Sequence, residues 1–129
     1  MRHSKYKKDL YSKPSEGEKY LLKKLVLESD VCPYNEWFET LSEHDQFMVI
    51  DRMARVRQGS FGEINVIDEG VWEFKFRKGR ALRIYYGQIG KVVLLLLIGG
   101  DKKTQKRDIK KAIEFFSNFK DGIGSDEDA

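Results

Sequence analysis

Residues 71–98 read VWEFKFRKGRALRIYYGQIGKVVLLLLI, and this stretch decides the fold. In residues 72–77 aromatic side chains at even positions alternate with charged side chains at odd positions, and in residues 82–86 apolar even positions alternate with Arg83 and Tyr85. A period of two predicts two strands that each bury one face and expose the other. The run VVLLLLI does not alternate and is too short for an independent helix, so it predicts a central strand buried on both faces.

The register of the two alternating strands follows from this pattern. Even residues of both strands share the buried face only if the numbers of cross-strand partners sum to an even number, as in the pair 74 and 82. The connection around residues 78–80 must then be odd in length, three or five residues, with Gly79 at positive φ. The odd positions are expected to line one exposed face together: Lys75, Arg77, Arg83 and Tyr85.

Two short helices are predicted before these strands. An alternating stretch from Tyr20 suits a first strand, and Pro33 then stands where a first helical residue belongs. Ser42 followed by Asp45 resembles a capping box that opens a second helix, and Gly59 ends it. The apolar side of this second helix is expected to carry Phe47, Ile50, Met53 and Ala54. Helices joined by so short a connection predict an antiparallel αα-hairpin.

A last helix is predicted after Gly99-Gly100-Asp101, with one apolar stripe and a basic beginning. The sequence therefore predicts an α+β fold of order βααβββα, a mostly antiparallel four-stranded sheet packed against the αα-hairpin and the C-terminal helix. Residues 1–19 are expected to be a flexible basic extension, residues 20–120 a single domain, and residues 121–129 an acidic tail.

Composition narrows the class of protein. The chain has 129 residues, of which 40% are hydrophobic and 35% charged, as in one globular domain. Its apolar runs are too short for a membrane helix and no signal peptide is recognisable, so a cytoplasmic protein without membrane contact is expected. Cys32, His3 and His44 lack the spacing of a zinc set, and we expect neither a metal nor another cofactor.

The charges are segregated although the net charge is only +3. Residues 71–91 hold six basic residues against Glu73, whereas residues 28–45 hold six acidic residues and no Lys or Arg. Such asymmetry favours a face that binds a polyanion, with a dispersed, solvated surface as the alternative.

The motif GGDKKTQ at 99–105 has two interpretations. A strand-to-helix turn needs glycines and Asp101 is a good helix cap, which accounts for the first three residues. Cations such as Lys102 and Lys103 in a first helical turn oppose the helix dipole, and a bound phosphate would reverse that effect. For the cationic sheet face, the alternative to an anion site is pairing with Glu73 or with acidic residues of the hairpin.

Three segments carry a resemblance to a known family: GVWEFKF, RALRIYYG and VVLLLLIGGDKKTQKRDIKKA. In this order they resemble the RelE/ParE superfamily of toxins, and within it the phage-derived addiction-module killer, or HigB-like, group. The resemblance covers about residues 20–116, including the RMARVRQGSFGE stretch, and its most specific part is GGDKKTQ with the following DI. The Gly79-Arg80-Ala81 turn and Lys75 depart from the pattern of the group, which has GPG and an Arg there.

The resemblance implies the toxin of a type II toxin–antitoxin pair. The implied partners are a small cognate antitoxin, expected to be a helix-turn-helix DNA-binding protein, and mRNA together with the ribosome. RelE-like and HigB-like members cleave mRNA and so inhibit translation, whereas ParE-like members poison DNA gyrase. The residues of this chain that occupy the positions of the group's functional residues are Lys75, Arg83, Tyr85 and Lys102.

Metal-independent cleavage of RNA by its own 2′-hydroxyl needs proton transfer and stabilisation of the phosphorane. We expect Arg83 to bind the scissile phosphate and Tyr85 or Lys75 to move the proton. The neighbouring phosphates are expected to be held by Arg77, Arg80, Lys102, Lys103 and Lys106. The alternatives are a gyrase inhibitor, a nucleic-acid-binding domain without catalysis, and a decayed toxin.

Overall fold

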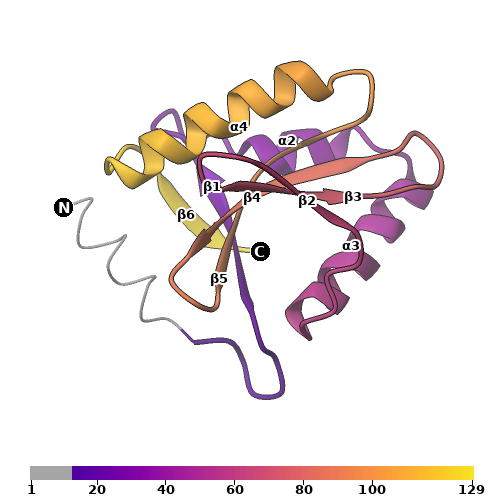
Figure 1. The fold of residues 1–129 in the computed structure, drawn as a ribbon, viewed down its shortest axis with the longest axis horizontal. Coiled ribbons are helices and arrows are strands. Elements are labelled where there is room, and N and C mark those ends of the chain that lie inside the picture. The colour runs from indigo at the N-terminus through magenta and orange to yellow at the C-terminus, as the bar shows by residue number, and fades with distance from the viewer. Residues whose placement is uncertain (1–12) are drawn as a thin grey trace.

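The computed structural model describes residues 13–129, so residues 1–12 of the expected basic extension lie outside the described residues. The elements follow one another along the chain as shown in Figure 1: β1 (Leu21–Val26), α2 (Pro33–Glu39), α3 (Glu43–Arg57), β2 (Ile64–Asp68), β3 (Val71–Lys75), β4 (Arg83–Ile89), β5 (Val93–Gly100), α4 (Gln105–Lys120) and β6 (Ser125–Asp128). No helix in this part of the chain is both long enough and apolar enough to span a bilayer.

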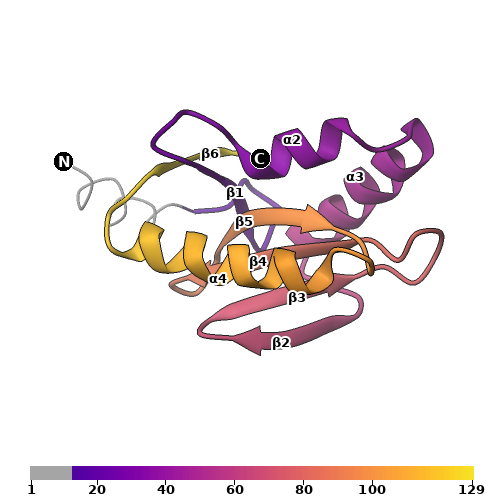
Figure 2. The ribbon, with the colours of Figure 1, turned by 90° about the horizontal axis from the view of Figure 1, so that it is seen from above.

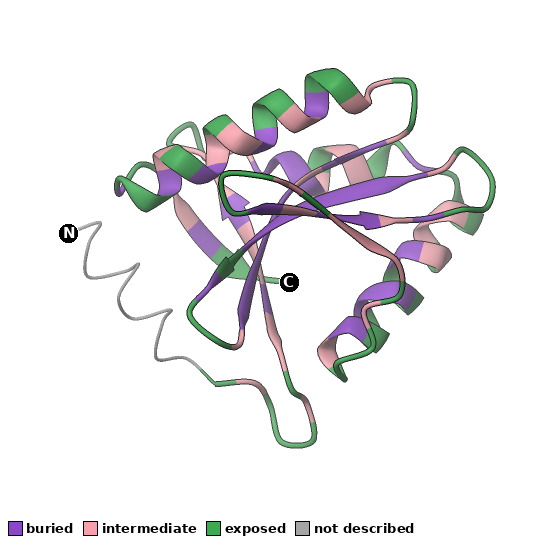
Figure 3. Ribbon diagram, viewed as in Figure 1, coloured by how far each residue is buried: buried purple, intermediate pink, exposed green. Residues whose placement is uncertain are grey.

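The fold has three layers, with a central sheet between helices (Figure 2). The strand order is β2-β3-β4-β5-β1-β6, and β1 is parallel to β5 while the other neighbours are antiparallel. One core lies between the sheet and α2 and α3, and a second lies between the sheet and α4. Figure 3 shows β4 and β5 buried along almost their whole length, as the apolar run predicts.

The predicted α+β class is confirmed, but the predicted four-stranded sheet is wrong because two strands were missed. The first, β2, pairs with β3 at one edge of the sheet and exposes Val66, so its pattern is that of a half-solvated edge strand between glycines. The second, β6, reads SDED and pairs with β1 at the other edge. Residues 125–128 are therefore part of the sheet and not of an acidic tail.

Charge pairing explains why so acidic a strand forms. Lys23 of β1 lies 2.8 Å from Asp128 and 3.5 Å from Asp126, and Lys24 lies 3.9 Å from Glu127. Opposite charges on neighbouring strands stabilise the pairing by several tenths of a kcal/mol each. The lysines of β1 therefore favour an acidic strand as the neighbour at this edge of the sheet.

The predicted parity of the register of the alternating strands is confirmed, although the partner of Phe74 is Ile84 and not Leu82. Phe74 pairs with Ile84 and Lys75 pairs with Arg83, so partner numbers sum to an even number. The amide of Phe76 donates to the carbonyl of Leu82, which leaves residues 77–81 as a five-residue connection, and Gly79 has φ 63°.

The helix boundaries agree with the sequence signals, but the predicted hairpin and one helix face are wrong. Pro33 is the first residue of α2, and the Ser42 hydroxyl accepts from the Asp45 amide at 3.1 Å. However, α2 and α3 diverge in Figures 1 and 2 instead of lying antiparallel. Phe47 and Ile50 are 66% and 56% exposed. The buried side of α3 is turned by about one residue and consists of Val49, Arg52, Met53 and Val56.

Close packing explains the glycine pair at the end of β5. The Trp37 ring of α2 covers Gly99, and the Asp108 carboxylate and Thr104 hydroxyl cover Gly100 from the opposite face, so neither position has room for a Cβ. The two glycines let helices on both faces approach the same strand end.

Replacing Gly99 by alanine is expected to lower the free energy of unfolding by about 1–3 kcal/mol, because the added methyl group meets the Trp37 ring. Urea denaturation measures this change, with Ser117→Ala on the exposed side of α4 as the control. A loss below about 0.5 kcal/mol, the range of ordinary surface changes, would contradict this packing.

Candidate functional site

The residues predicted for the site come from strand ends that meet at one end of the sheet. Lys75 at the end of β3 pairs with Arg83 at the start of β4, and Arg83 in turn pairs with Gly100 at the end of β5. Arg80 of the β3–β4 connection lies 3.5 Å from Asp101. The backbone thus brings the predicted positions together, but their side chains separate into three groups.

The first group is buried beneath α4, so the prediction that Arg83 and Tyr85 lie on an exposed face is wrong. Arg83 is 5% exposed and Tyr85 is fully buried. Arg83 Nη1 donates to Glu73 Oε1 at 3.1 Å, which is the pairing that the sequence left open as the alternative. The physical reason is that α4 covers the odd-numbered face, with Ala112 and Phe116 packing in the same core as Tyr85.

Glu73 is the centre of this buried group. It accepts hydrogen bonds from Asn65 Nδ2 at 2.9 Å and from Gln105 Nε2 at 3.1 Å. Burial opposes ionisation of Glu73, but these hydrogen bonds and the Arg83 charge outweigh it and hold the pKa of the carboxyl below its usual value. Burial, and then the Glu73 charge, raise the pKa of Tyr85 well above its ordinary value, so Tyr85 is a poor proton-transfer group here.

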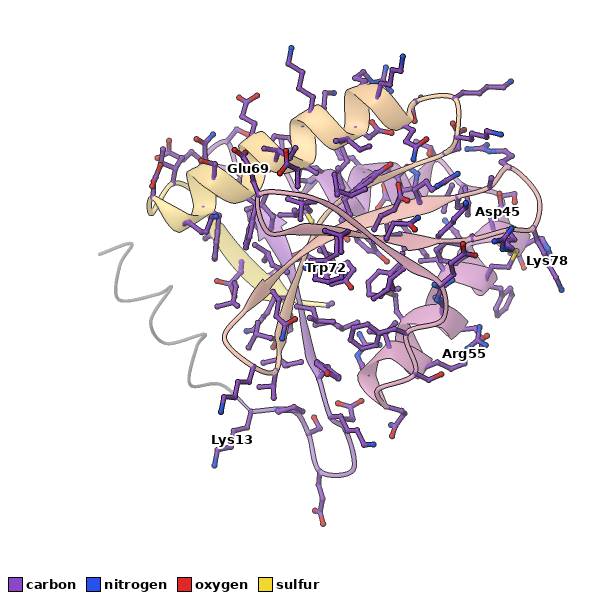
Figure 4. All side chains as sticks on the ribbon, viewed as in Figure 1. Lys13, Asp45, Arg55, Glu69, Trp72 and Lys78 are labelled. Carbon is purple, nitrogen blue, oxygen red and sulfur yellow. The ribbon has the colours of Figure 1, made fainter. Side chains whose placement is uncertain are left out.

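The second group lies in an open groove of about 460 Å³ between α3 and the end of β3. Five basic and two acidic residues line it, together with two apolar ones: Arg52, Arg55, Lys75, Arg77, Lys78, Asp51, Glu63, Met48 and Phe76. Figure 4 shows Arg55 of α3 and Lys78 of the β3–β4 connection on the same side of the molecule. We call this the basic groove.

Glu63 is the acidic centre of the basic groove. Arg77 Nε and Nη2 donate to its two carboxylate oxygens at 2.6 and 3.0 Å, and Lys75 Nζ lies 3.8 Å away. The Glu63 and Lys75 side chains are half-buried, whereas that of Arg77 is 74% exposed. A carboxylate, an ammonium group and a guanidinium group therefore share one solvent-accessible position.

Arg52 is a structural part of the groove wall. Its guanidinium is buried, donates to the carbonyls of Phe61, Glu63 and Lys75 at 2.8–2.9 Å, and lies over the Phe76 ring at 4.8 Å. These bonds fasten α3 to the segment that carries Glu63 and to the strand end that carries Lys75. Arg52 thus fixes the distance between α3 and the end of β3, which form the two sides of the basic groove.

Replacing Arg52 by lysine is expected to lower the free energy of unfolding by about 2 kcal/mol, because one ammonium group cannot reach all three carbonyls and a buried acceptor without a partner is costly. Thermal or urea unfolding measures the loss, and Arg55→Lys on the exposed side of the same helix is the control. Equal free energies of unfolding of Arg52→Lys and Arg55→Lys would show that the three hydrogen bonds of Arg52 do not stabilise this side of the groove.

The third group is exposed where β5 passes into α4. The Asp101 carboxylate accepts from the amides of Lys103 and Thr104 at 2.9 and 3.2 Å, and α4 begins only at Gln105. Asp101 therefore caps a turn before the helix, and Lys102 and Lys103 precede the first helical turn in which the sequence placed them. Lys102, Lys103 and Lys106 are exposed, as is Arg80.

The basic groove can support acid–base chemistry at a phosphate, because a carboxylate accepts a proton while the cations beside it stabilise an oxyanion. The structure brings Lys75 and Arg77 into it and excludes Arg83 and Tyr85 from it. Glu63, Arg52, Arg55 and Lys78 were not predicted as site residues. The closely spaced arginines of RMARVRQGSFGE are the feature of the sequence that could have indicated this groove.

Comparison with known proteins adds one relative. The chain is 39% identical over 61 residues to an uncharacterized protein of Haemophilus influenzae, an alignment that covers 47% of this chain and 62% of the relative. The chain thus spans less than two thirds of the length of the relative that it matches. No family model matches the chain.

Proposed function

We propose that this protein is the toxin of a type II toxin–antitoxin pair and that it inhibits translation by cleaving mRNA in the cytoplasm. The single observation that carries the proposal is the basic groove, in which Glu63 stands between Lys75 and Arg77. The resemblance of residues 20–116 to RelE/ParE toxins supports the same class of protein. A small antitoxin that covers the basic side chains is the proposed partner.

The proposed reaction needs only groups of this chain and of the RNA. Glu63 takes the proton of a ribose 2′-hydroxyl, and the 2′-oxygen attacks the adjacent phosphorus. Arg77 stabilises the charge on the phosphorane oxygens. The bond from phosphorus to the 5′-oxygen then breaks, and that oxygen leaves with a proton from Lys75. The products are a 2′,3′-cyclic phosphate and a 5′-hydroxyl, so no oxidant, metal or water is consumed.

One observation favours a second candidate, a toxin that binds its target without cutting RNA. Arg83 and Tyr85, which the resemblance places in the chemistry, are buried beneath α4 and Arg83 is neutralised by Glu73. A protein that poisons a target such as DNA gyrase by surface contact would not need these groups to be accessible.

Induction of the chain in cells, with and without its neighbouring small open reading frame, separates these candidates. The nuclease predicts growth arrest with new transcript 5′ ends inside translated regions, and relief by the second reading frame. Intact transcripts together with broken DNA would replace the nuclease by a gyrase inhibitor. Growth arrest with intact RNA and intact DNA would indicate a toxin that acts by binding its target without cutting a nucleic acid.

A further inference from the structure

A second concave region lies at the carboxyl ends of β1 and β5. These strands are adjacent and parallel, with Leu21 opposite Val93 and Lys24 opposite Leu96. The chain leaves β1 for α2 on one face of the sheet and leaves β5 for α4 on the other (Figure 2). Where two neighbouring parallel strands send their helices to opposite faces, a crevice opens that ligands commonly occupy. An open cavity of about 540 Å³ lies at this place, and we call it the switch-point crevice.

The two sides of the switch-point crevice differ in chemistry. Apolar and aromatic side chains from the β1–α2 connection, from α2, from β5 and from α4 form one part of its lining: Leu27, Val31, Pro33, Trp37, Ile98 and Phe115. Three cations form the other part, Arg80 from the β3–β4 connection and Arg107 and Lys111 from α4. An apolar side beside a cationic side matches a planar base joined to a phosphate.

Three acidic residues also line the crevice and partly neutralise its cations: Glu36, which is exposed, Asp101 and Asp108. Asp108 is buried against the Thr104 hydroxyl, and Asp101 is engaged by two backbone amides. Arg80 and Arg107 lie 3.5 and 3.7 Å from these carboxylates, longer than a charge-assisted hydrogen bond, and their side chains are 55% and 66% exposed. Both guanidinium groups therefore have donors to offer a ligand.

The β3–β4 connection contributes residues to both the basic groove and the crevice. Arg77 and Lys78 line the groove and Arg80 lines the crevice, so the β3–β4 connection separates the two. Lys78 and Arg80 are two residues apart, at most about 7 Å between Cα atoms. An extended strand of a few nucleotides is therefore long enough to reach from Lys78 to Arg80.

We propose that the switch-point crevice binds one nucleotide of single-stranded RNA, with its base against the apolar side and its phosphate on Arg80, Arg107 and Lys111. This inference rests on the proposed function, because it names where the RNA beside the cleaved bond is held. Single-stranded RNA suits such a site, because its unstacked bases are free to enter a pocket.

The indole group of Trp37 reports whether a ligand binds in the crevice. Its Nε1 is buried without a hydrogen-bond partner among residues 13–129, and its ring lines the crevice. In a Trp72→Phe background the only indole is that of Trp37. The probe is a six-nucleotide 2′-O-methyl oligoribonucleotide, which lacks the attacking hydroxyl and stays intact. An abasic oligomer of the same length tests whether the base is needed, and the deoxy form tests whether RNA is preferred.

A saturable shift of the Trp37 indole resonance with the 2′-O-methyl oligomer is expected, and little shift with the abasic one. Arg107→Gln together with Lys111→Gln is expected to weaken the affinity about tenfold, because phosphate contacts are lost. Lys110→Gln, on the exposed side of the same helix, is expected to change the affinity less than about twofold, because this side chain is outside the crevice.

Three outcomes would overturn the inference: an indole that does not move at saturation, equal affinities of the double variant and Lys110→Gln, or equal shifts with the abasic or the deoxy oligomer. RNA cleavage is measured in parallel with unmodified RNA. An unmoved indole with intact cleavage refutes the crevice alone, whereas an indole shift without cleavage refutes the nuclease alone.

Discussion

Replacing Glu73 by alanine is expected to lower the free energy of unfolding by about 3–5 kcal/mol, because it leaves a buried guanidinium without its counter-charge. Glu73 is fully buried and Arg83 is 5% exposed, so water cannot take the place of the carboxylate. The amide groups of Asn65 and Gln105 would lose their acceptor as well. Urea denaturation followed by circular dichroism measures the change.

Two further variants test the cause of this loss. Glu73→Gln keeps an acceptor for the neighbouring amides and is expected to lose less than Glu73→Ala. Combining Glu73→Leu with Arg83→Met removes both charges and is expected to be more stable than Glu73→Ala, because no isolated charge remains. If Glu73→Ala cost no more than the exposed change Glu114→Ala, the buried pair would not be a determinant of the fold.

The pH dependence of stability follows from the lowered pKa of Glu73. The folded-state pKa lies below the unfolded value of about 4.3, so the contribution is complete above that pH and is lost as the pH falls through the folded-state pKa. The stability difference between the wild type and Glu73→Gln is therefore expected to be constant near neutral pH and to shrink below about pH 4. A difference that grew on acidification would contradict the direction of the shift.

Replacing Glu63 by glutamine is expected to lower the rate of RNA cleavage by a factor of about 10²–10⁴, the usual contribution of a general base. Glutamine has nearly the same shape and still faces Arg77 and Lys75, but it cannot accept the proton. The fold should change little, because the ion pairs of Glu63 are partly exposed and are worth about 1 kcal/mol or less. Single-turnover cleavage of a defined transcript on translating ribosomes measures the rate.

The matched control for this variant is Glu114→Gln, an exposed carboxylate of α4 outside the basic groove. It is expected to cleave at the wild-type rate. Equal rates for wild type, Glu63→Gln and Glu114→Gln would remove Glu63 from the chemistry, whatever the source of the toxicity.

Local patterns predicted the strands and the helix ends, because those features depend on neighbouring residues. The alternation in residues 72–77 and 82–86 fixes the register, and Pro33, Ser42 and Gly59 mark helix ends. The missed strands depend on distant partners: β6 exists because Lys23 and Lys24 attract acidic residues about a hundred positions away. No local pattern in SDED contains that information.

The errors about the site have the same origin. Alternation shows that Arg83 and Tyr85 share a face with Glu73, but not that α4 covers this face. The basic groove depends on Arg52, which spans from α3 to the carbonyls of two other segments. Such a contact between distant segments cannot be read from spacing, so Glu63 was not recognised as a site residue.

The chemistry of the RNA ends tests the central claim most directly. Transcripts are recovered after induction of the wild type, and their new 5′ ends are mapped by ligation with and without prior phosphorylation by a kinase. If Glu63 and its cations in the basic groove direct attack by the 2′-hydroxyl, the new ends carry a 5′-hydroxyl, require the kinase for ligation, and are absent with Glu63→Gln. New ends that carry a 5′-phosphate, or the same ends with Glu63→Gln, would contradict the claim.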